Sequence, residues 1–516
     1  MQGRYYCWLE NFFHFTKKNT YIILSKVSSI MVPEETLDPE NWDKMRTLGH
    51  QMLDDMLDYL KNIREKPVWQ MIPKNVKSNL KTPIPEEGED REKIYREFKE
   101  NILPYPLGNI HPRFWGWVYG TGTPFGVLAD MLVSTTNSDT GGGEHAANYV
   151  ETQVIEWTKD MLDYNSDASG ILVSGCSMAN LIGLAVARNI KAGYNIIEEG
   201  VRSCDKDLLF YGSTEMHFSI DKATQILGLG LNSLRKIPIN NKYEINIKKL
   251  RETVEEDIKS GFKPVCIIGN VGTVNTGAVD DLHALADLAA EYDMWFHVDG
   301  AFGIWCKLSP TSKHLVDGID RADSIAFDFH KWMYMQYEAG CVLIRSRKDH
   351  LHSFSLTPDY LAYHTRGTGS GEIQFLDYGL QLSRGDRALK IWMCIKEHGI
   401  KKYSRLIEQN IQQAKYLTEL IKKEDLLELL APTSMNIVNF RYNNGQSDVA
   451  ILNKMNEEIL LQLQEKGIAV PSSTILNGNY SIRLGITNHR SKKEDFDILI
   501  KEIMKIADTI TSKNKN

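Results

Sequence analysis

Lys331 has the residue type and the surroundings of an amine that reacts with a carbonyl group. It follows a short apolar run, residues 324–327, which is typical of a buried strand, and it comes directly after His330. Most lysines are solvated surface groups, and a lysine taken alone would be interpreted as one. At a strand end the amine is partly desolvated, which makes it more nucleophilic and able to form a Schiff base. Lys331 is therefore a candidate catalytic residue.

Asp299 ends a second apolar run, residues 295–298, and an acid in that position needs a partner. A buried carboxylate is costly unless it is paired, and the protonated nitrogen of a pyridine ring is a suitable partner. Gly300 and Ala301 follow, and their small size lets a flat ring lie close to the backbone. A metal ligand or a helix N-cap is the alternative interpretation. The small residues after Asp299 favour a cofactor ring held by this acid.

A turn of small residues, Ser174-Gly-Cys-Ser177, lies between an expected strand at 170–173 and an expected helix at 179–189. Such a turn presents free backbone N–H groups and the positive end of the helix dipole, which suit a phosphate group. Many α/β turns look alike, so a tight turn with an N-cap is the alternative. Cys176 and Ser177 are candidate phosphate-binding residues.

His217 lies beyond another expected strand, at 207–211, and between the phosphate turn and Asp299 in chain order. A lone histidine is more often structural. A histidine in this place can also stack on a pyridine ring and hydrogen-bond a substrate carboxylate. Its order in the chain makes His217 a candidate site residue.

These features, in this order and spacing, resemble the fold-type I enzymes that use pyridoxal 5'-phosphate (PLP), and within them the group II amino-acid decarboxylases. The resemblance extends from about residue 40 to about residue 505. It implies a PLP-dependent transferase-like fold, a homodimer, and the loss of CO2 from an L-amino acid to give an amine. The residues that the resemblance assigns to the cofactor are the Schiff-base lysine Lys331, the pyridine partner Asp299, the ring-stacking His217, Ala301 beneath the ring, Cys176 and Ser177 in the phosphate turn, and His330 before the lysine.

The resemblance also assigns two further positions. Thr273 lies near the family's cofactor-facing threonine, but Val274 stands where some members have a second threonine. Residues 356–361 resemble the family's mobile loop, and Tyr360 takes the place of the tyrosine that protonates the substrate carbon after CO2 departs. In the family, tyrosine there goes with amine formation and phenylalanine with aldehyde synthesis. The Gly/Ser/Thr-rich run 365–371 fits a flexible lid, and an ordinary surface loop is the alternative.

The substrate side chain is expected to contact the aromatic segment 111–119, which resembles the family's substrate-lining stretch. Trp115, Trp117 and Tyr119, with Phe114 beside them, could form a pocket for an aromatic amino acid, although aromatic residues also fill cores. Arg113 could bind an acidic side chain, so an acidic substrate such as glutamate or cysteine sulfinate is the alternative. Ser383-Arg384 is a candidate contact from the dimer partner.

The expected fold class is α/β, because short apolar runs alternate with helical patterns from His111 onward, which predicts a mostly parallel sheet between helices. Beyond residue 391, helices expected at 396–424 and 447–466 are interleaved with strands near 435–440 and 480–486. The predicted parts are an extension that is poorly ordered (1–30), an N-terminal helical segment (31–110), a large PLP-binding domain (111–391) and a small α+β domain (392–516).

Composition narrows the partners. The formal net charge of -7 argues against broad nucleic-acid binding, and no apolar stretch has the length of a membrane span. Seven scattered cysteines without a C-x-x-C pair indicate reduced thiols and no zinc site. We therefore expect a cytoplasmic enzyme with a small-molecule substrate. The alternative functions are a PLP-dependent carbon–carbon lyase, an aldehyde synthase and an inactive regulatory homologue. An inactive homologue would be expected to lack Lys331 or Asp299.

Overall fold

The structure is a computed structural model that describes residues 34–203, 205–356 and 365–513. The predictions for residues 1–30 and for Tyr360 lie outside these ranges. The chain divides into two compact units, Met1–Asp58 and Tyr59–Asn516, and the first contains most of helix α2 (Trp42–Lys61). Within the described ranges, no helix has both the length and the apolar character needed to cross a lipid bilayer.

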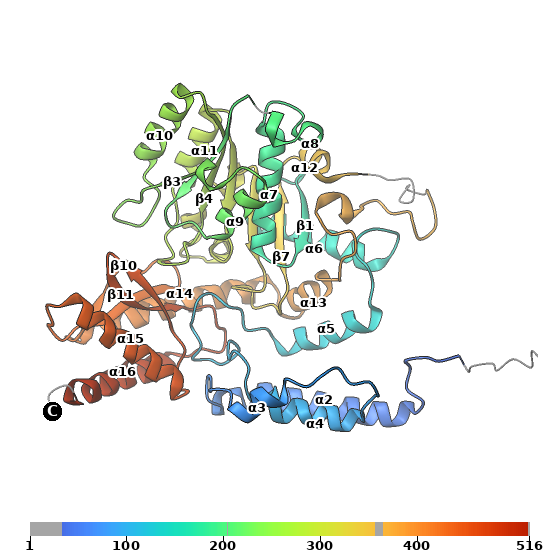
Figure 1. The fold of residues 1–516 in the computed structure, drawn as a ribbon, viewed down its shortest axis with the longest axis vertical. Helices are drawn as coiled ribbons and strands as arrows, with labels where there is room; N and C mark the ends of the chain where they lie inside the picture. The colour runs from blue at the N-terminus through green and yellow to red at the C-terminus, as the bar shows by residue number, and fades with distance from the viewer. Residues whose placement is uncertain (1–33, 204, 357–364, 514–516) are drawn as a thin grey trace, which may run out of the picture. The chain divides into compact units, whose positions relative to one another are not determined.

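The larger unit is built on a seven-stranded sheet with the order β1-β7-β6-β5-β4-β2-β3 (Figure 1). Its strands are β1 (Ser169–Val173), β2 (Leu208–Ser213), β3 (Leu234–Ile237), β4 (Lys263–Asn270), β5 (Trp295–Asp299), β6 (Ser324–Asp328) and β7 (Gly340–Ile344). Strands β3, β2, β4, β5 and β6 pair in parallel, whereas β7 runs antiparallel to both β1 and β6. The predicted α/β class and the mostly parallel sheet are confirmed.

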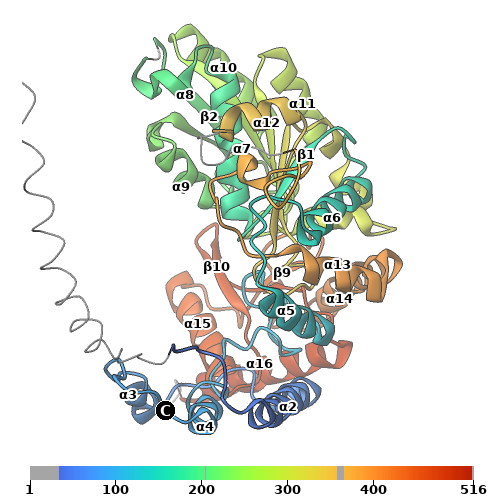
Figure 2. The same cartoon turned by 90° about the vertical axis from the view of Figure 1, so that its right-hand side faces the viewer.

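Helices cover both faces of this sheet (Figure 2). A side chain added at Gly183, in helix α7 (Cys176–Lys191), would collide with His297 of β5. The preceding residue of that strand, Phe296, lies beside Leu285 of helix α11 (Leu282–Glu291), because both would touch a side chain added at Gly269. Since successive strand residues point to opposite faces, α7 and α11 cover opposite faces of the sheet.

A second sheet lies toward the C-terminus and is antiparallel, with the order β10-β11-β9-β8. Its strands are β8 (Leu427–Leu429), β9 (Ile437–Tyr442), β10 (Ser472–Leu476) and β11 (Asn479–Gly485). It packs with helices α14 (Ile400–Lys423), α15 (Val449–Glu465) and α16 (Lys493–Lys513) around an apolar cluster distinct from that of the large sheet. An α+β part after the large sheet is therefore present as expected.

One predicted helix is wrong in its extent. The single helix expected at 396–424 is two helices, α13 (Ala388–His398) and α14, separated by Gly399 with φ +67°. That left-handed backbone suits glycine and ends the first helix. The other helices of the larger unit are α3 (Lys74–Asn79), α4 (Arg91–Asn101), α5 (Pro124–Thr136), α6 (Ala146–Leu162), α8 (Ile196–Glu199), α9 (Ser219–Ile226), α10 (Ile247–Lys259) and α12 (Arg347–Phe354). Short 3-10 turns are η1 (Ile63–Glu65), η2 (Val201–Ser203), η3 (Leu231–Ser233), η4 (Gly303–Leu308), η5 (Lys313–Val316), η6 (Ile319–Arg321) and η8 (Phe375–Tyr378).

Candidate active site

The carboxyl ends of β1, β2, β5 and β6 meet at one edge of the large sheet, where they surround a cavity of about 260 Å³. Crevices at this edge of a parallel sheet are the usual ligand sites of α/β proteins. Eight of the residues singled out in the sequence line the cavity: Tyr119, Cys176, Ser177, His217, Asp299, Ala301, His330 and Lys331. The structure thus brings together side chains that are far apart in the chain.

Asp299 is held by three donors at the end of β5, and its side chain is only 5% exposed. Its Oδ2 accepts a hydrogen bond from Nδ2 of Asn180 (2.9 Å), and its Oδ1 accepts from the amide of Ala301 (3.1 Å) and the thiol of Cys176 (3.4 Å). These donors satisfy the carboxylate oxygens and fix the orientation of the side chain. Asp299 is therefore suited to pair with a protonated ring nitrogen.

A chain of buried polar groups orients the amide of Asn180 behind Asp299. The hydroxyl of Ser324 accepts from Nε1 of Trp295 (2.7 Å) and lies 2.7 Å from Nδ1 of His297, to which it can donate. His297 Nε2 then donates to Oδ1 of Asn180 (2.9 Å), which turns Nδ2 of Asn180 toward Asp299. Burial lowers the pKa of His297 to about 4, so the ring stays neutral with its proton on Nε2.

Lys331 extends into the cavity beside the carboxylate of Asp328. Its Nζ lies 3.1 Å from Oδ2 of Asp328, and Oδ1 of the same carboxylate accepts from the amide of Cys176 (2.6 Å). The turn before Cys176 fits closely against β7, because a side chain at Gly340 would lie 2.5 Å from Cα of Gly175. Two glycines therefore place the first turn of α7 next to the lysine.

His217 presents a neutral ring to the cavity. Its Nδ1 accepts hydrogen bonds from the hydroxyl (2.8 Å) and the amide (3.2 Å) of Ser219. The Ser219 hydroxyl in turn accepts from Nδ2 of Asn180 (3.1 Å), so the ring is linked to the group that orients Asp299. Burial lowers the pKa of His217, which leaves Nε2 as the protonated nitrogen near neutral pH.

Two of the three predicted substrate residues do not line the cavity. Trp115 is fully buried, stacks on Phe496 (ring centroids 4.8 Å apart) and donates from Nε1 to Ser491 (3.0 Å). Its assignment to substrate is wrong, because its indole fills the core of the second sheet. Trp117 is 48% exposed and outside the cavity wall, whereas Tyr119 is part of it.

Thr273 is also not at the cavity. Its hydroxyl lies 3.0 Å from that of Thr276 and accepts the amide of Ala278 (3.1 Å), and its carbonyl accepts the amide of Gly277 (2.8 Å). A hydroxyl used to close its own turn has little capacity left for a cofactor. The expectation that Thr273 binds the cofactor is therefore not met in this structure.

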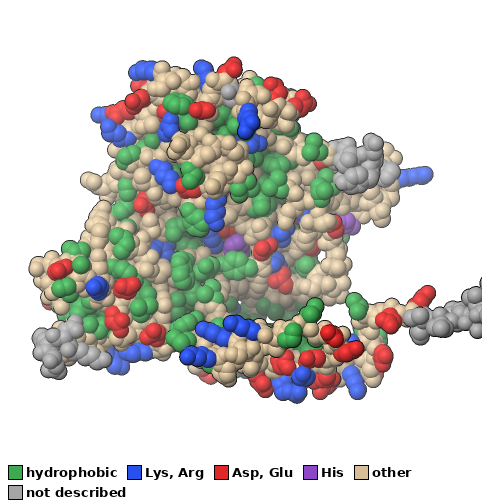
Figure 3. Space-filling view, viewed as in Figure 1, with side chains coloured by type: hydrophobic (Ala, Val, Ile, Leu, Met, Phe, Trp, Pro, Cys, Tyr) green, Lys and Arg blue, Asp and Glu red, His purple; other side chains and the backbone are tan. Residues whose placement is uncertain are grey.

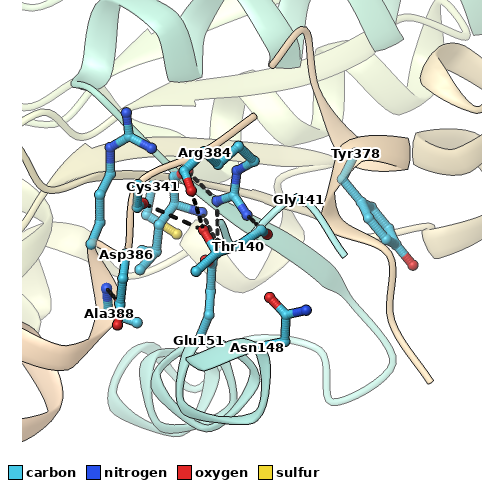
Figure 4. A network of polar contacts seen from close by, with 12 residues as sticks. Thr140, Gly141, Asn148, Glu151, Cys341, Tyr378, Arg384, Asp386 and Ala388 are labelled. Carbon is cyan, nitrogen blue, oxygen red and sulfur yellow. Dashed lines mark hydrogen bonds and ion pairs between the residues drawn. The ribbon is translucent and has the colours of Figure 1, made fainter. Parts of the chain in front are cut away.

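Arg384 was expected to reach a partner subunit, and this expectation is wrong. Its side chain is buried within its own chain, and Figure 4 shows the guanidinium turned toward Glu151 and Thr140. It donates to Oε1 of Glu151 (2.5 Å) and to the carbonyl oxygens of Thr140 and Leu172 (both 2.7 Å). All of these partners belong to the same large domain.

The cavity wall also contains five residues that the sequence reasoning did not select, namely Asn180, Ser219, Asp328, Tyr337 and Glu338. Asp328 could have been selected from the sequence, since it ends an apolar strand just as Asp299 does. Asn180 lies one helical turn after Cys176, on the side of α7 that a ligand at the helix start would face. Tyr337 and Glu338 come from a loop whose path no local pattern indicates.

The donors at the cavity fit PLP. Asp299 suits the ring nitrogen, the start of α7 with the amide and hydroxyl of Ser177 suits the phosphate, and Lys331 suits the aldehyde. The helix's own first turn already uses the amides of Met178 and Ala179, which both donate to the carbonyl of Gly175. His217 and Ala301 also line the cavity, as a ring held between them would require.

Comparison of the sequence with known proteins points to the same cofactor. Residues 73–443 match the family model described as the pyridoxal-dependent decarboxylase conserved domain. An aromatic-L-amino-acid decarboxylase from Bacillus atrophaeus is 34% identical over 91% of this chain and 96% of its own length. A phenylacetaldehyde synthase from Petunia hybrida is 27% identical over 87% of this chain and 91% of its own length.

The fold has solved counterparts as well. The structure of the Oryza sativa protein TDC with PLP and tryptamine superposes with a TM-score of 0.85 over 92% of this chain and all of that one, at 24% identity. At that identity the likeness concerns the fold, whereas the family model and the Bacillus relative identify the family. The chain belongs to the pyridoxal-dependent decarboxylases and is a PLP-dependent carboxy-lyase that acts on an amino acid.

Proposed function

We propose that the enzyme decarboxylates an aromatic L-amino acid to the corresponding amine. The cavity beside Lys331 has aromatic walls, Tyr119 and Tyr337, whose ring centroids lie 6.4 Å apart. Aromatic rings favour contact with other rings at such separations. The names of several relatives, an aromatic-L-amino-acid decarboxylase and plant tyrosine and tryptophan decarboxylases among them, support the same substrate class.

The observation that carries this choice is the position of Arg113. An acidic substrate would need a cation beside its side chain, and Arg113 was the candidate. Its Nε donates to the carbonyl of Ile468 (2.7 Å), and its Nη1 lies 3.8 Å from Oδ1 of Asp495. Among the described residues that line the cavity there is no arginine, and both histidines are neutral, so Lys331 is the one cation there that could balance an acidic side chain.

PLP, when bound, supplies an electron sink for the electron pair left on the substrate α-carbon after CO2 departs. Asp299 would hold the protonated ring nitrogen, and Asn180 fixes the orientation of Asp299. His217 offers its ring face and an Nε2 proton to the substrate side of the cavity. Tyr360, by its place in the sequence, delivers the proton that completes the amine product.

Product analysis over a panel of amino acids tests the proposal. Tyrosine, tryptophan and dihydroxyphenylalanine should release CO2 and yield one amine each, whereas glutamate, cysteine sulfinate and 2,4-diaminobutyrate should not. The Lys331→Ala variant is the control for uncatalysed loss of CO2. Turnover of an acidic substrate at a higher kcat/KM than any aromatic one would replace the proposal. Aldehyde with ammonia, or cleavage of a side-chain bond, would identify the aldehyde synthase or carbon–carbon lyase alternative.

We also infer a homodimer in the cytoplasm. Ile226, Leu380 and Leu382 are more than half exposed and border one groove, and Figure 3 shows hydrophobic side chains gathered on the surface of this unit. Exposed apolar surface of this kind favours association. Cysteines 176, 266, 306, 341 and 394 are buried free thiols, which suits a reducing compartment. Light scattering at micromolar concentration tests the dimer, and fractionation of the source cells tests the compartment.

A further inference from the structure

Asp328, at the end of β6, has a side chain that is almost completely buried (2% exposed). Its Oδ1 accepts the amide of Cys176 (2.6 Å), the first residue of α7. Its Oδ2 lies 3.1 Å from Nζ of Lys331 and 3.6 Å from Nε2 of His330. Each oxygen of this carboxylate therefore contacts a positive group, the helix start on one side and the lysine on the other.

The contact with Lys331 occupies the amine that the cofactor needs, and the contact with Cys176 lies at the helix start that suits the phosphate. Amides at a helix start bind phosphate, and here one of them already binds a carboxylate. To join an aldehyde, the ammonium ion of Lys331 must first release one proton. The neutral amine then forms the carbon–nitrogen bond, and its two remaining hydrogens leave with the aldehyde oxygen as water. An anion 3.1 Å away favours the ammonium form and so opposes the first of these steps.

The surroundings of the lysine strengthen this effect. Burial alone would lower the pKa of Lys331, yet Asp328, Cys176 and Asp299 together raise it above the ordinary value. The other titratable groups at the cavity are Tyr119, His217, His330, Tyr337 and Glu338. Burial lowers the pKa of both histidines, so neither adds a positive charge near pH 7 that could replace the lysine as partner of Asp328.

We propose that Asp328 is a counter-anion that competes with the cofactor for Lys331 and for the start of α7. It holds Lys331 as an ammonium ion, which must lose a proton before it joins an aldehyde, and it places a negative charge beside the helix start that suits a phosphate. The charge of Asp328 thus weakens retention of the cofactor. The inference concerns cofactor loading and does not depend on which amino acid the enzyme decarboxylates.

Binding of inorganic phosphate to the full chain freed of cofactor is the first test, measured by calorimetry at pH 7.5. Asp328→Asn keeps the size of the side chain and removes a negative charge beside the start of α7, so phosphate should bind at least about tenfold more tightly. The matched control is Asp287→Asn, because this exposed acid pairs with Arg321 outside the cavity and carries the same charge. Equal or weaker phosphate binding by Asp328→Asn than by the unmodified chain overturns the proposal.

The second test uses pyridoxal, which has the aldehyde but no phosphate, so that only the state of the lysine is probed. The rate at which the absorbance of the carbon–nitrogen double bond appears should rise with pH as the ammonium ion loses its proton. In Asp328→Asn this rise should occur at least about one pH unit lower, since the anion that stabilises the ammonium form is absent. An unchanged pH profile contradicts the role of Asp328.

If circular dichroism shows that Asp328→Asn does not fold, the partner of Asp328 can be replaced in its place. Lys331→Met removes the ammonium ion and leaves the charge of Asp328 uncompensated. This variant should therefore bind inorganic phosphate several-fold more weakly than the unmodified chain, and Asp328→Ser in the same background should restore binding. Phosphate affinity that Lys331→Met leaves unchanged would show that Asp328 does not govern the anion site.

Discussion

Arg384 and Glu151 form an ion pair inside the protein, with Nη2 and Oε1 2.5 Å apart and side chains that are 1% and 0% exposed. Glu151 Oε1 also accepts the amide of Leu172 in β1 (2.9 Å). The guanidinium of Arg384 lies over the ring of Phe375, 5.1 Å from its centroid. It also donates to the carbonyl oxygens of Thr140 and Leu172 (Figure 4). One buried pair thereby ties the loop before α13 to α6 and to the strand that leads into α7.

Removing one member of this pair should strongly destabilise the protein. Glu151→Ala leaves the guanidinium of Arg384 buried without its counter-charge, which costs about 3 to 5 kcal/mol in comparable buried pairs. We expect a lower midpoint of urea unfolding, measured by tryptophan fluorescence. Replacing both residues, as Glu151→Leu with Arg384→Met, should destabilise less than Glu151→Ala alone, because no uncompensated charge remains. A single variant with an unchanged midpoint would mean that water or another group satisfies the arginine.

Asn180 is predicted to act through Asp299. Asn180→Ala removes the hydrogen bond to Oδ2 of Asp299 and also breaks the link to His297. A less well held carboxylate pairs more weakly with the ring nitrogen, so kcat should fall by about tenfold or more and cofactor affinity should fall with it. Asn189→Ala is the matched control, since Asn189 lies on the same helix and bonds Arg188. Equal kcat and equal cofactor absorbance in both variants would remove Asn180 from the site.

The catalytic centre could be predicted from the sequence because its key residues follow apolar strands. Asp299 and Lys331 each come at or just after a run of buried residues, and parallel strands bring such ends to one edge. Trp115 could not be assigned in the same way. An aromatic residue in an aromatic segment has the same local pattern whether it faces a ligand or, as here, packs on Phe496. The domain boundary near residue 391 stays a prediction.

Long-range pairing explains the other differences. Arg384 follows a polar loop, and only the folded chain reveals that Glu151 lies beside it. Thr273 belongs to a turn whose hydrogen bonds run from one residue to the next few, and the sequence does not show which way its hydroxyl points. Edge strands such as β3 and β8 are short and half exposed, so their apolar signal was too weak to be recognised.

Stability should decrease as the pH falls from 7 to 5. His350 and His297 are fully buried, and burial lowers their pKa values to about 3 and about 4, below the unfolded value of about 6.5. At a pH between the native and the unfolded pKa, the unfolded chain binds a proton that the native chain does not. Each histidine should therefore lower the free energy of unfolding by about 2 kcal/mol at pH 5. The measurement is the urea midpoint at several pH values.

His350→Gln isolates one of these contributions. The native ring bonds the hydroxyl of Ser169 (2.9 Å) and the carbonyl of Tyr378 (2.8 Å), and glutamine offers a donor and an acceptor without a titrating ring. The variant should lose some stability at pH 7 but show a smaller decrease toward pH 5. His352→Gln, on the exposed side of the same helix, is the control and should keep the original slope. Parallel pH profiles for both variants would contradict the assignment to His350.

Tyr360→Phe tests the proton donor that the sequence predicts. Without its hydroxyl the substrate carbon loses the group expected to protonate it, so amine output should fall at least about a hundredfold. Aldehyde and ammonia should appear in its place if oxygen reacts with the unprotonated carbon. The measurement is chromatography of the products under air and under nitrogen. Unchanged amine output would remove Tyr360 from the mechanism and leave proton delivery to another group, such as His217.

Lys331→Ala should abolish the visible absorbance band of the bound cofactor, because the covalent bond to its aldehyde requires this amine. Decarboxylation should fall below detection, while the far-ultraviolet circular dichroism stays that of the unmodified chain. Lys159→Met is the matched control: this lysine is also buried, but its Nζ bonds the carbonyl of Ala168 (3.2 Å) and pairs with Glu156. The control should lower the unfolding midpoint and keep the absorbance band. A band that persists in Lys331→Ala would place the covalent link on another lysine and would refute the site described above.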